Sequence, residues 1–353
     1  MKAKPQKKQA VLTAIAVVLT AALLLALLWR TNTEKQNTRA ESTTYIMSTV
    51  MEQKAYGAAA EKAMAAVEQA LRNFENELSL FISESDIAAI NAAAGMQPVT
   101  VKPQTLALLT QAKELSLQKS DGAFALTIAP LTLAWGVTTD TPRVLSQSER
   151  DALLPLVDDS AITLDAAAGT VMLQKAGQAV DLGGIAKGTA CNVARDIYKK
   201  YKVDSALLSI GGNIYAHGAK PDGSLYRIGF RDPKKSATAS IASITLKDEV
   251  FAVSGGYERF FEQDGVRYHH ILDPKTGAPA HSDIVSVGVI DADGTVADFY
   301  STTLFVWGKA RALEYLKNGG KGMLLDEENN LYVSQSLKET FELVESGYHV
   351  IFV

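Results

Sequence analysis

Apolar residues recur along the chain with two different spacings, which predict a mixture of helices and strands. Between residues 58 and 78 they recur at intervals of three and four, which places them on one face of a helix. Further helices are predicted at 83–91, 106–117, 186–200, 297–307 and 309–317. Short apolar runs predict strands at 161–164, 170–173, 206–210, 226–230, 241–246, 249–253 and 284–290. These elements do not alternate regularly, which favours an α+β fold over a doubly wound parallel sheet.

The N-terminus carries the longest apolar run. Four lysines in the first eight residues precede an uncharged stretch from 10 to 29. A helix of that length can cross a bilayer, and the lysines favour a cytoplasmic N-terminus. We therefore predict a membrane anchor at 1–30, with a cleaved signal peptide as the alternative. Residues 31–44 are polar and predict a linker, followed by one domain over 45–353 that begins near Tyr45.

Composition adds little to this outline. The 353 residues are 47% hydrophobic, enough for a packed core, and the net charge of −4 gives no reason to expect a nucleic-acid partner. Cys191 is the only cysteine, so an intramolecular disulfide is excluded. We expect Cys191 to be a small buried hydrophobic residue.

Two glycine pairs follow apolar segments and are candidates for ligand-binding loops. The first lies in 180–188, where a helix is predicted to begin near Ile185 and Lys187 adds a positive charge. Free N–H groups at a helix start and a nearby ammonium suit a phosphate, although such a loop is equally often a simple tight turn. Its spacing fits neither a P-loop nor a dinucleotide-binding motif. The second pair precedes Asn213, which predicts a turn with Asn213 in the left-handed region.

Two further segments carry side chains suited to catalysis. His269 and His270 are adjacent, so on a strand they would point to opposite faces and at most one would face a site. Asp298 and Thr302 are four residues apart and would share one face of a helix. A carboxylate and a hydroxyl there suit a hard cation. The alternative is that Asp298 only caps the helix.

These segments belong to a series of short motifs in a fixed order. They are Met-Ser-Thr at 47–49, Ser-Leu-Phe at 79–81, the segment 122–136, Asp-Leu-Gly-Gly-Ile-Ala-Lys-Gly at 181–188, Gly-Gly-Asn at 211–213, Ser-Gly-Gly-Tyr-Glu-Arg at 254–259, His-Ile-Leu-Asp-Pro-Lys-Thr-Gly at 270–277 and Ala-Asp-Phe-Tyr-Ser-Thr at 297–302. In this order they resemble the ApbE family of flavin transferases over about residues 45–325.

The resemblance implies a magnesium-dependent FAD:protein FMN transferase with an ApbE-like α+β domain. Such an enzyme cleaves FAD, attaches FMN through a phosphoester to a Thr or Ser of an acceptor protein and releases AMP. The implied metal ligands are the Gly184 carbonyl, the Asp298 carboxylate and the Thr302 hydroxyl, and the implied catalytic residues are His270, Lys187 and Asp298. The implied flavin and phosphate contacts are Met47, Phe81, Ala123, Phe124, Ala125, Asp181, Lys187 and Ile271.

Three positions depart from the family pattern. Ser48 replaces a glycine, Phe81 a tyrosine and Ala125 an aspartate. None of them is an implied metal ligand, so we expect these changes to alter flavin affinity and not to abolish activity.

The resemblance also implies partners and a location. The substrate would be FAD, and the acceptor a flavoprotein with a Ser/Thr flavinylation motif, from a membrane redox complex. Combined with the N-terminal anchor, this places the domain on the periplasmic side of a bacterial inner membrane. Two alternatives remain open: an FAD pyrophosphatase, in which water replaces the acceptor hydroxyl, and a non-catalytic flavin-binding protein. The presence of Lys187 and of all implied metal ligands favours an enzyme.

The N-terminal pattern gives a first testable prediction. Protease added to intact cells, or to spheroplasts where an outer membrane blocks access, should release the folded domain by cutting near residues 31–44, because the lysines keep only the N-terminus inside. A cytosolic marker protein should stay intact in the same sample. A domain that survives until the cells are lysed would contradict this topology.

Overall fold

The computed structural model describes residues 38–235 and 239–353, together with Thr20. Apart from Thr20, the predicted anchor at 1–30 lies outside the described residues, as does the predicted linker up to residue 37. Within the described ranges, no helix is long and apolar enough to cross a membrane.

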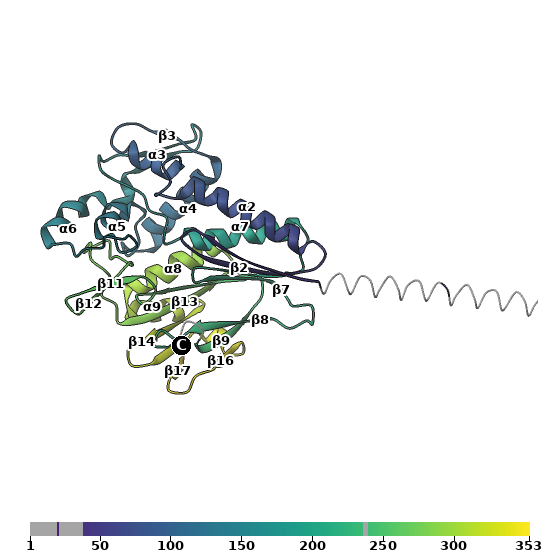
Figure 1. The fold of residues 1–353 in the computed structure, drawn as a ribbon. Coiled ribbons are helices and arrows are strands. Elements are labelled where there is room, and N and C mark those ends of the chain that lie inside the picture. Colours follow the sequence, from purple (N-terminus) through teal and green to yellow (C-terminus); the bar gives the residue numbers. More distant parts are fainter. Residues whose placement is uncertain (1–19, 21–37, 236–238) are drawn as a thin grey trace, which may run out of the picture.

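A mixed sheet of nine strands forms the centre of the described part of the chain, in the order β1-β2-β6-β7-β10-β13-β14-β15-β17 (Figure 1). Neighbouring strands are antiparallel except for β15 and β17, which are parallel. The strands are β1 Arg39–Ile46, β2 Thr49–Tyr56, β6 Ser205–Ile210, β7 Asn213–Gly218, β10 Glu249–Gly255, β13 Ile284–Asp291, β14 Gly322–Asp326, β15 Asn330–Val333 and β17 His349–Phe352.

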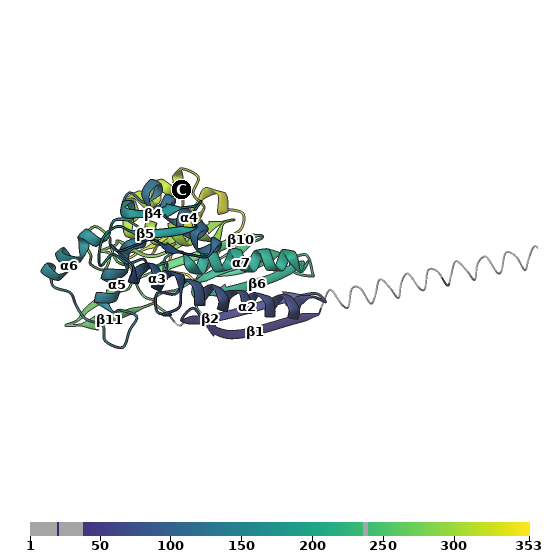
Figure 2. The same ribbon diagram turned by 90° about the horizontal axis from the view of Figure 1, so that it is seen from above.

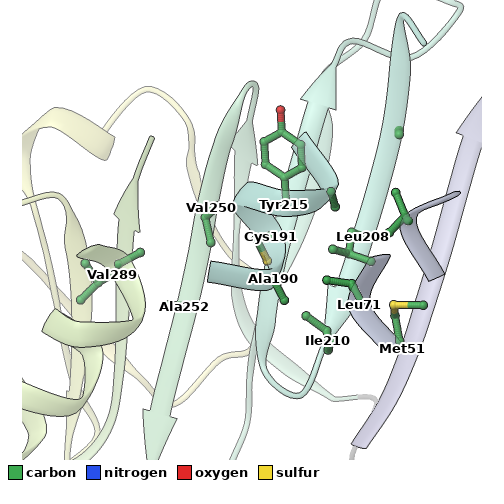
Figure 3. Close-up of a cluster of buried hydrophobic side chains, with 14 of the residues drawn as sticks. Met51, Leu71, Ala190, Cys191, Leu208, Ile210, Tyr215, Val250, Ala252 and Val289 are labelled. Atoms are coloured by element: carbon green, nitrogen blue, oxygen red, sulfur yellow. The ribbon is translucent and has the colours of Figure 1, made fainter. Parts of the chain in front are cut away.

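Helices cover one face of this sheet. They are α2 Ala60–Leu78, α7 Ala186–Lys200, α8 Gly294–Trp307 and α9 Lys309–Lys317. Seen from above, α2 and α7 run beside each other over β2 and β6 (Figure 2). The apolar stripe predicted for α2 faces inward: Met64, Val67 and Leu71 are buried in one cluster with side chains of the sheet and of α7. Figure 3 shows Cys191 in this cluster, which confirms that the cysteine is a buried core residue.

A smaller sheet covers the opposite face. It contains β8 Tyr226–Arg231, β9 Ser240–Leu246 and β16 Phe341–Leu343, in the order β16-β9-β8. Its side chains share a buried cluster with β10, β13 and β14, for example Phe230 against Phe251, whose ring centroids are 6.0 Å apart. The chain therefore forms a layered structure of helices, central sheet and second sheet (Figure 1).

The remaining elements pack around one end of these layers. They are α3 Asp86–Ala92, α4 Pro103–Lys119, α5 Ala129–Trp135, α6 Gln147–Leu153, the sheet of β3 Val99–Thr100, β5 Thr170–Leu173 and β4 Ile162–Asp165, and the hairpin of β11 Phe260–Gln263 and β12 Val266–His269, with short 3-10 helices η1 Leu126–Ile128, η2 Leu154–Leu156 and η3 Asp159–Ala161. A further 3-10 helix, η4 Gln335–Leu337, buries Leu337 in the cluster of the second sheet. The Ser85 side chain caps α3 by accepting a hydrogen bond from Ala88 N–H at 2.9 Å.

The α+β fold class is confirmed, and each predicted helix and strand has a counterpart in the structure. The pattern missed α5, α6, β3, β7, β11, β12 and β14 to β17. It also missed β1 and β2, and β1 places the start of the domain at Arg39, before the expected start near Tyr45. These strands form one edge of the sheet, and polar, exposed residues of β1 hide the apolar alternation. The expected left-handed conformation of Asn213 is wrong. Gly211 and Gly212 have positive φ, whereas Asn213 is the first residue of β7 and pairs with Ile210.

The helices α7 and α8 touch at two glycines near their N-termini. A Cβ atom at Gly188 would overlap the carbonyl oxygen of Gly294, and a Cβ at Gly294 would overlap the carbonyl oxygen of Gly188. A Cβ at Gly188 would also lie 2.6 Å from that of Asp298. The two backbones are therefore in direct contact, and this contact sets where the first turn of α7 lies relative to Asp298.

This contact predicts that neither glycine tolerates a methyl group. Gly188→Ala and Gly294→Ala should each lower the free energy of unfolding by about 2 kcal/mol or more, because the helices must separate to remove the overlap. Thermal and urea unfolding of the purified protein measure this. Lys199→Ala, an exposed position on α7, serves as the control and should change stability by less than about 0.5 kcal/mol. A wild-type unfolding midpoint for Gly188→Ala would show that the contact is not tight.

Candidate active site

Two neighbouring cavities open where the two glycine loops meet α8 and the β11–β12 hairpin. Their volumes are about 280 Å³ and about 150 Å³. Phe81, Asp181, Gly183, Lys187 and Arg259 line both cavities. The two spaces therefore share a wall that carries two cationic side chains.

The structure brings the predicted site residues together at these cavities. The larger cavity is lined by Phe81, Ala123, Phe124, Ala125, Asp181, Gly184, Lys187, His270, Ile271, Asp298 and Thr302. Met47 lines the smaller one, beside Ser48 in the turn between β1 and β2, where both residues have positive φ. These residues come from segments up to 255 positions apart, between Met47 and Thr302. Their individual roles stay predictions.

The three predicted metal ligands all line the larger cavity. Asp298 is 3% exposed, and one carboxylate oxygen, Oδ2, accepts a hydrogen bond from Gly188 N–H at 2.8 Å. Within the described chain, Oδ1 and the Gly184 carbonyl oxygen accept no hydrogen bond. A Cβ built on Gly184 would lie 3.6 Å from Thr302 Oγ1, which shows how close these two residues are. A carboxylate, a carbonyl and a hydroxyl are the ligands of a hard cation, so the residues present fit magnesium.

The alternative role of Asp298, as the cap of its own helix, is wrong. Helix α8 begins at Gly294, and the Asp293 side chain caps it by accepting a hydrogen bond from Thr295 N–H at 2.9 Å. Asp298 lies in the second turn and instead accepts from Gly188, in the first turn of α7. Its carboxylate therefore satisfies one free N–H group of a neighbouring helix and leaves Oδ1 without a hydrogen-bond partner among the described residues.

The second glycine pair positions Lys187. A Cβ at Gly211 would lie 2.8 Å from Lys187 Cδ and 2.9 Å from Thr49 Cγ2, and Gly211 has φ of +52°. Only a glycine leaves room here for the lysine stem. Lys187 Nζ donates to the Gly183 carbonyl at 3.1 Å. The ammonium group is thus held over the glycine loop at the wall that the two cavities share.

His270 is held in one orientation by the residue before the β11–β12 hairpin. Its backbone N–H donates to the Arg259 carbonyl at 3.1 Å, and its Nδ1 lies 3.2 Å from the same oxygen. A carbonyl only accepts, so in the neutral ring Nδ1 carries the proton and Nε2 keeps a free lone pair. Burial, followed by the charge of Lys187, lowers the pKa of His270 to about 4. The ring is therefore a neutral acceptor at physiological pH.

The neighbouring His269 has a structural role. Its Nε2 donates to the Ala280 carbonyl at 3.1 Å, and its Nδ1 lies 3.3 Å from Ile271 N–H, so both ring nitrogens have partners. The ring also meets Phe305 edge-on, with centroids 5.5 Å apart. The expectation that at most one of the two histidines faces a site is confirmed.

A buried carboxylate that the sequence did not reveal holds the wall at 123–126. Asp159 is 4% exposed and accepts hydrogen bonds from Ser116 Oγ, from the N–H groups of Leu126 and Thr127, and from Thr127 Oγ1, at 2.6 to 2.9 Å. Leu126 in turn accepts from Asp181 N–H at 2.8 Å. Asp159 thereby fixes the predicted flavin-contacting segment against the first glycine loop.

The carboxylate of Asp181 lies at the wall that the two cavities share. Burial raises its pKa, while hydrogen bonds from Gly183 N–H and Thr132 and the charge of Lys187 act in the opposite direction. At the shared wall it is the acidic counterpart of Lys187.

Ser254 and Arg259, the two ends of the motif at 254–259, also line the larger cavity. Ser254 Oγ lies 2.8 Å from Ser301 Oγ and 3.4 Å from Thr302 Oγ1, so it supports the hydroxyl predicted to bind metal. Arg259 Nη2 donates to the Ser48 carbonyl at 3.0 Å. In the sequence, only the motif at 254–259 indicates that these two residues belong to the site. Their contacts with Thr302 and Ser48 cannot be predicted from the sequence, because the partners are far apart along the chain.

Comparison with known proteins agrees with this geometry. The model of the ApbE family matches residues 44–324. The chain is 34% identical over 285 residues to an FAD:protein FMN transferase of Klebsiella pneumoniae, covering 80% of this chain and 88% of that relative. It is 36% identical over 260 residues to an FAD:protein FMN transferase of Treponema pallidum, covering 70% and 72%.

Solved structures show the same fold. The crystal structure of an ApbE protein from Thermotoga maritima superposes with a TM-score of 0.79 at 31% identity, covering 86% of this chain and 99% of that one. The apo form of the flavinyl transferase ApbE from Pseudomonas stutzeri gives 0.76 at 29% identity, covering 86% and 97%. The resemblance predicted from the motifs is confirmed: the chain belongs to the ApbE family, whose curated relatives are transferases.

Proposed function

We propose that this protein is a magnesium-dependent FAD:protein FMN transferase. It cleaves the diphosphate of FAD, attaches FMN through a phosphoester to a Thr or Ser of an acceptor protein and releases AMP. The observation that carries the proposal is the convergence of three hard oxygen ligands, Lys187 and a neutral His270 on one cavity, in a chain of the ApbE family. Phosphoryl transfer requires mainly alignment and neutralisation of charge, which such a set provides.

Gly184, Asp298 and Thr302 would hold the magnesium ion. When bound, the ion would polarise the diphosphate and offset the negative charge that grows on it. Asp298 is prepared for this task because Gly188 N–H fixes Oδ2 and leaves Oδ1 available. Lys187 would contribute a second positive charge from the first turn of α7.

His270 would take the proton of the acceptor hydroxyl. Its Nδ1–H is committed to the Arg259 carbonyl, so Nε2 is the atom that accepts the proton. The hydroxyl oxygen then bonds to the FMN phosphorus, the bond from this phosphorus to the bridging oxygen breaks, and AMP leaves with the bonding electrons. Water in place of the hydroxyl would give FMN and AMP, the pyrophosphatase reaction.

The N-terminal sequence supports a location for this reaction. With residues 1–30 as an anchor, the domain would act at the periplasmic face of the inner membrane, on an acceptor flavoprotein of a membrane redox complex. Ser48, Phe81 and Ala125 all lie at the cavities and so would tune flavin binding.

The test of the proposed function is FMN transfer by the purified protein with FAD, magnesium and an acceptor that carries a flavinylation motif. Mass spectrometry should show an FMN-sized increase on the acceptor. Asp298→Ala and Asp298→Asn should both lower the rate by about a hundredfold or more, because a metal-bound carboxylate contributes several kcal/mol.

Asp298→Asn separates the metal role from the capping role, because the amide oxygen can still accept from Gly188 N–H. Glu314→Ala, at an exposed position on α9, is the control for loss of a charge. Near-wild-type transfer by Asp298→Asn would show that Asp298 only accepts the hydrogen bond from Gly188 N–H at the start of α7 and does not bind the metal. Release of free FMN with no acceptor labelling would point to the pyrophosphatase.

The lowered pKa of His270 predicts an unusual pH profile. A base is active only when it is unprotonated. With a pKa of about 4, His270 should lose its activity as a base, and kcat/KM for FAD should fall, only when the pH approaches 4. Between pH 7.5 and 5.5 we expect a change of less than about threefold, whereas an ordinary histidine, with a pKa of about 6.5, would lose about tenfold. His270→Ala should be slower by about a hundredfold or more at every pH. A rising limb centred near pH 6.5 would contradict this state of the ring.

A further inference from the structure

Arg259 lies close to both His270 and Ser48 at the wall of the two cavities, although it is far from Ser48 in the sequence. It precedes β11, and His270 follows β12, so the hairpin brings the two residues together at its base. From there the Arg259 side chain reaches the turn between β1 and β2, 211 residues away, and donates to the Ser48 carbonyl at 3.0 Å. It lines both cavities, as Lys187 does from the first turn of α7.

The positive charge of Arg259 is not neutralised by the protein. The adjacent carboxylate, Glu258, is bound by Arg231, whose Nη1 donates to Glu258 Oε1 at 2.9 Å. Within the described ranges, Arg259 forms no ion pair, and its one side-chain hydrogen bond is the one to Ser48. A guanidinium group has five N–H donors, so most of them remain available at the cavity wall.

Arg259 places an unpaired positive charge beside His270, the proposed base, and this arrangement requires a physical explanation. Burial, and after it the charges of Lys187 and Arg259, lower the pKa of His270. Two cations at the wall between two cavities would attract a ligand with negative charge at its middle and a group at each end. The diphosphate of a dinucleotide has this form, and the arginine fork matches two oxygens of one phosphate.

We propose that Arg259 is a second phosphate-binding cation of this site, which acts together with Lys187 from the base of the β11–β12 hairpin. The inference rests on the proposed function for the identity of the ligand as FAD. This role adds Arg259, a residue of the 254–259 motif, to the residues proposed to bind substrate. It also explains the hydrogen bond to the Ser48 carbonyl, which would orient the guanidinium group towards the cavities.

Direct binding measurements test the proposal without turnover. FAD and riboflavin are titrated into the purified full-length protein in EDTA, and tryptophan or flavin fluorescence reports the dissociation constants. Arg259→Gln should weaken FAD binding by about 10- to 100-fold, the cost of a lost charged hydrogen bond. Riboflavin, which has no phosphate, should bind within about twofold of wild type. Arg259→Lys should show an intermediate loss for FAD, since it keeps the charge but loses the fork.

Arg267→Gln is the matched control on the same hairpin. Its guanidinium pairs with Glu262 and lies over the Phe260 ring at 4.0 Å, and it lines neither cavity, so both flavins should bind as in wild type. Equal losses of FAD and riboflavin in Arg259→Gln would show that Arg259 only holds the turn at Ser48. Unchanged FAD binding would also overturn the proposal.

The outcome is separable from that of the proposed function. A wild-type protein that binds FAD through Arg259 but labels no acceptor would refute the transferase and leave the phosphate role intact. Normal transfer together with normal FAD binding by Arg259→Gln would refute the phosphate role alone.

Discussion

The site depends on a direct backbone contact between α7 and α8. Neither Gly188 nor Gly294 has room for a Cβ, so the first turns of the two helices touch. At this distance Asp298 on α8 reaches Gly188 N–H on α7 and accepts its hydrogen bond. A methyl group at either glycine would separate the carboxylate from Gly184 and Lys187. A packing constraint within the helix layer therefore sets the geometry of the proposed metal site.

The elements around this contact are organised by buried polar groups. Asp159 fixes the wall at 123–126 through four hydrogen bonds, and the carbonyl of Arg259 fixes the ring of His270. Burying these polar groups costs little free energy as long as each one has its hydrogen-bond partner. Loss of one partner would leave a buried polar group unsatisfied and destabilise the fold. The side chains proposed to act in catalysis are thus oriented before substrate arrives, which is the arrangement that electrostatic stabilisation of a transition state requires.

The two glycine loops serve different purposes, although they look alike in sequence. The loop at 183–184 leaves a carbonyl oxygen free at the cavity, whereas Gly211 makes space for the stem of Lys187. By sequence alone, the first loop is either a phosphate site or a turn, and the second is a turn. Together they place one cation at the wall between the cavities, and Arg259 approaches the same wall from the β11–β12 hairpin.

The sequence alone determined six of the helices and seven of the strands in the described part of the chain, because their apolar spacing reports burial directly, and the order of its motifs determined the family. It did not determine β1 and β2, whose exposed polar residues carry no such signal. Only the tertiary structure decided that Asp298 caps α7 and not α8, that Asp159 supports the wall at 123–126, and that Arg259 contacts Ser48 and His270. These contacts join residues between 11 and 211 positions apart, and local pattern carries no information about which distant chain segment will pack against it.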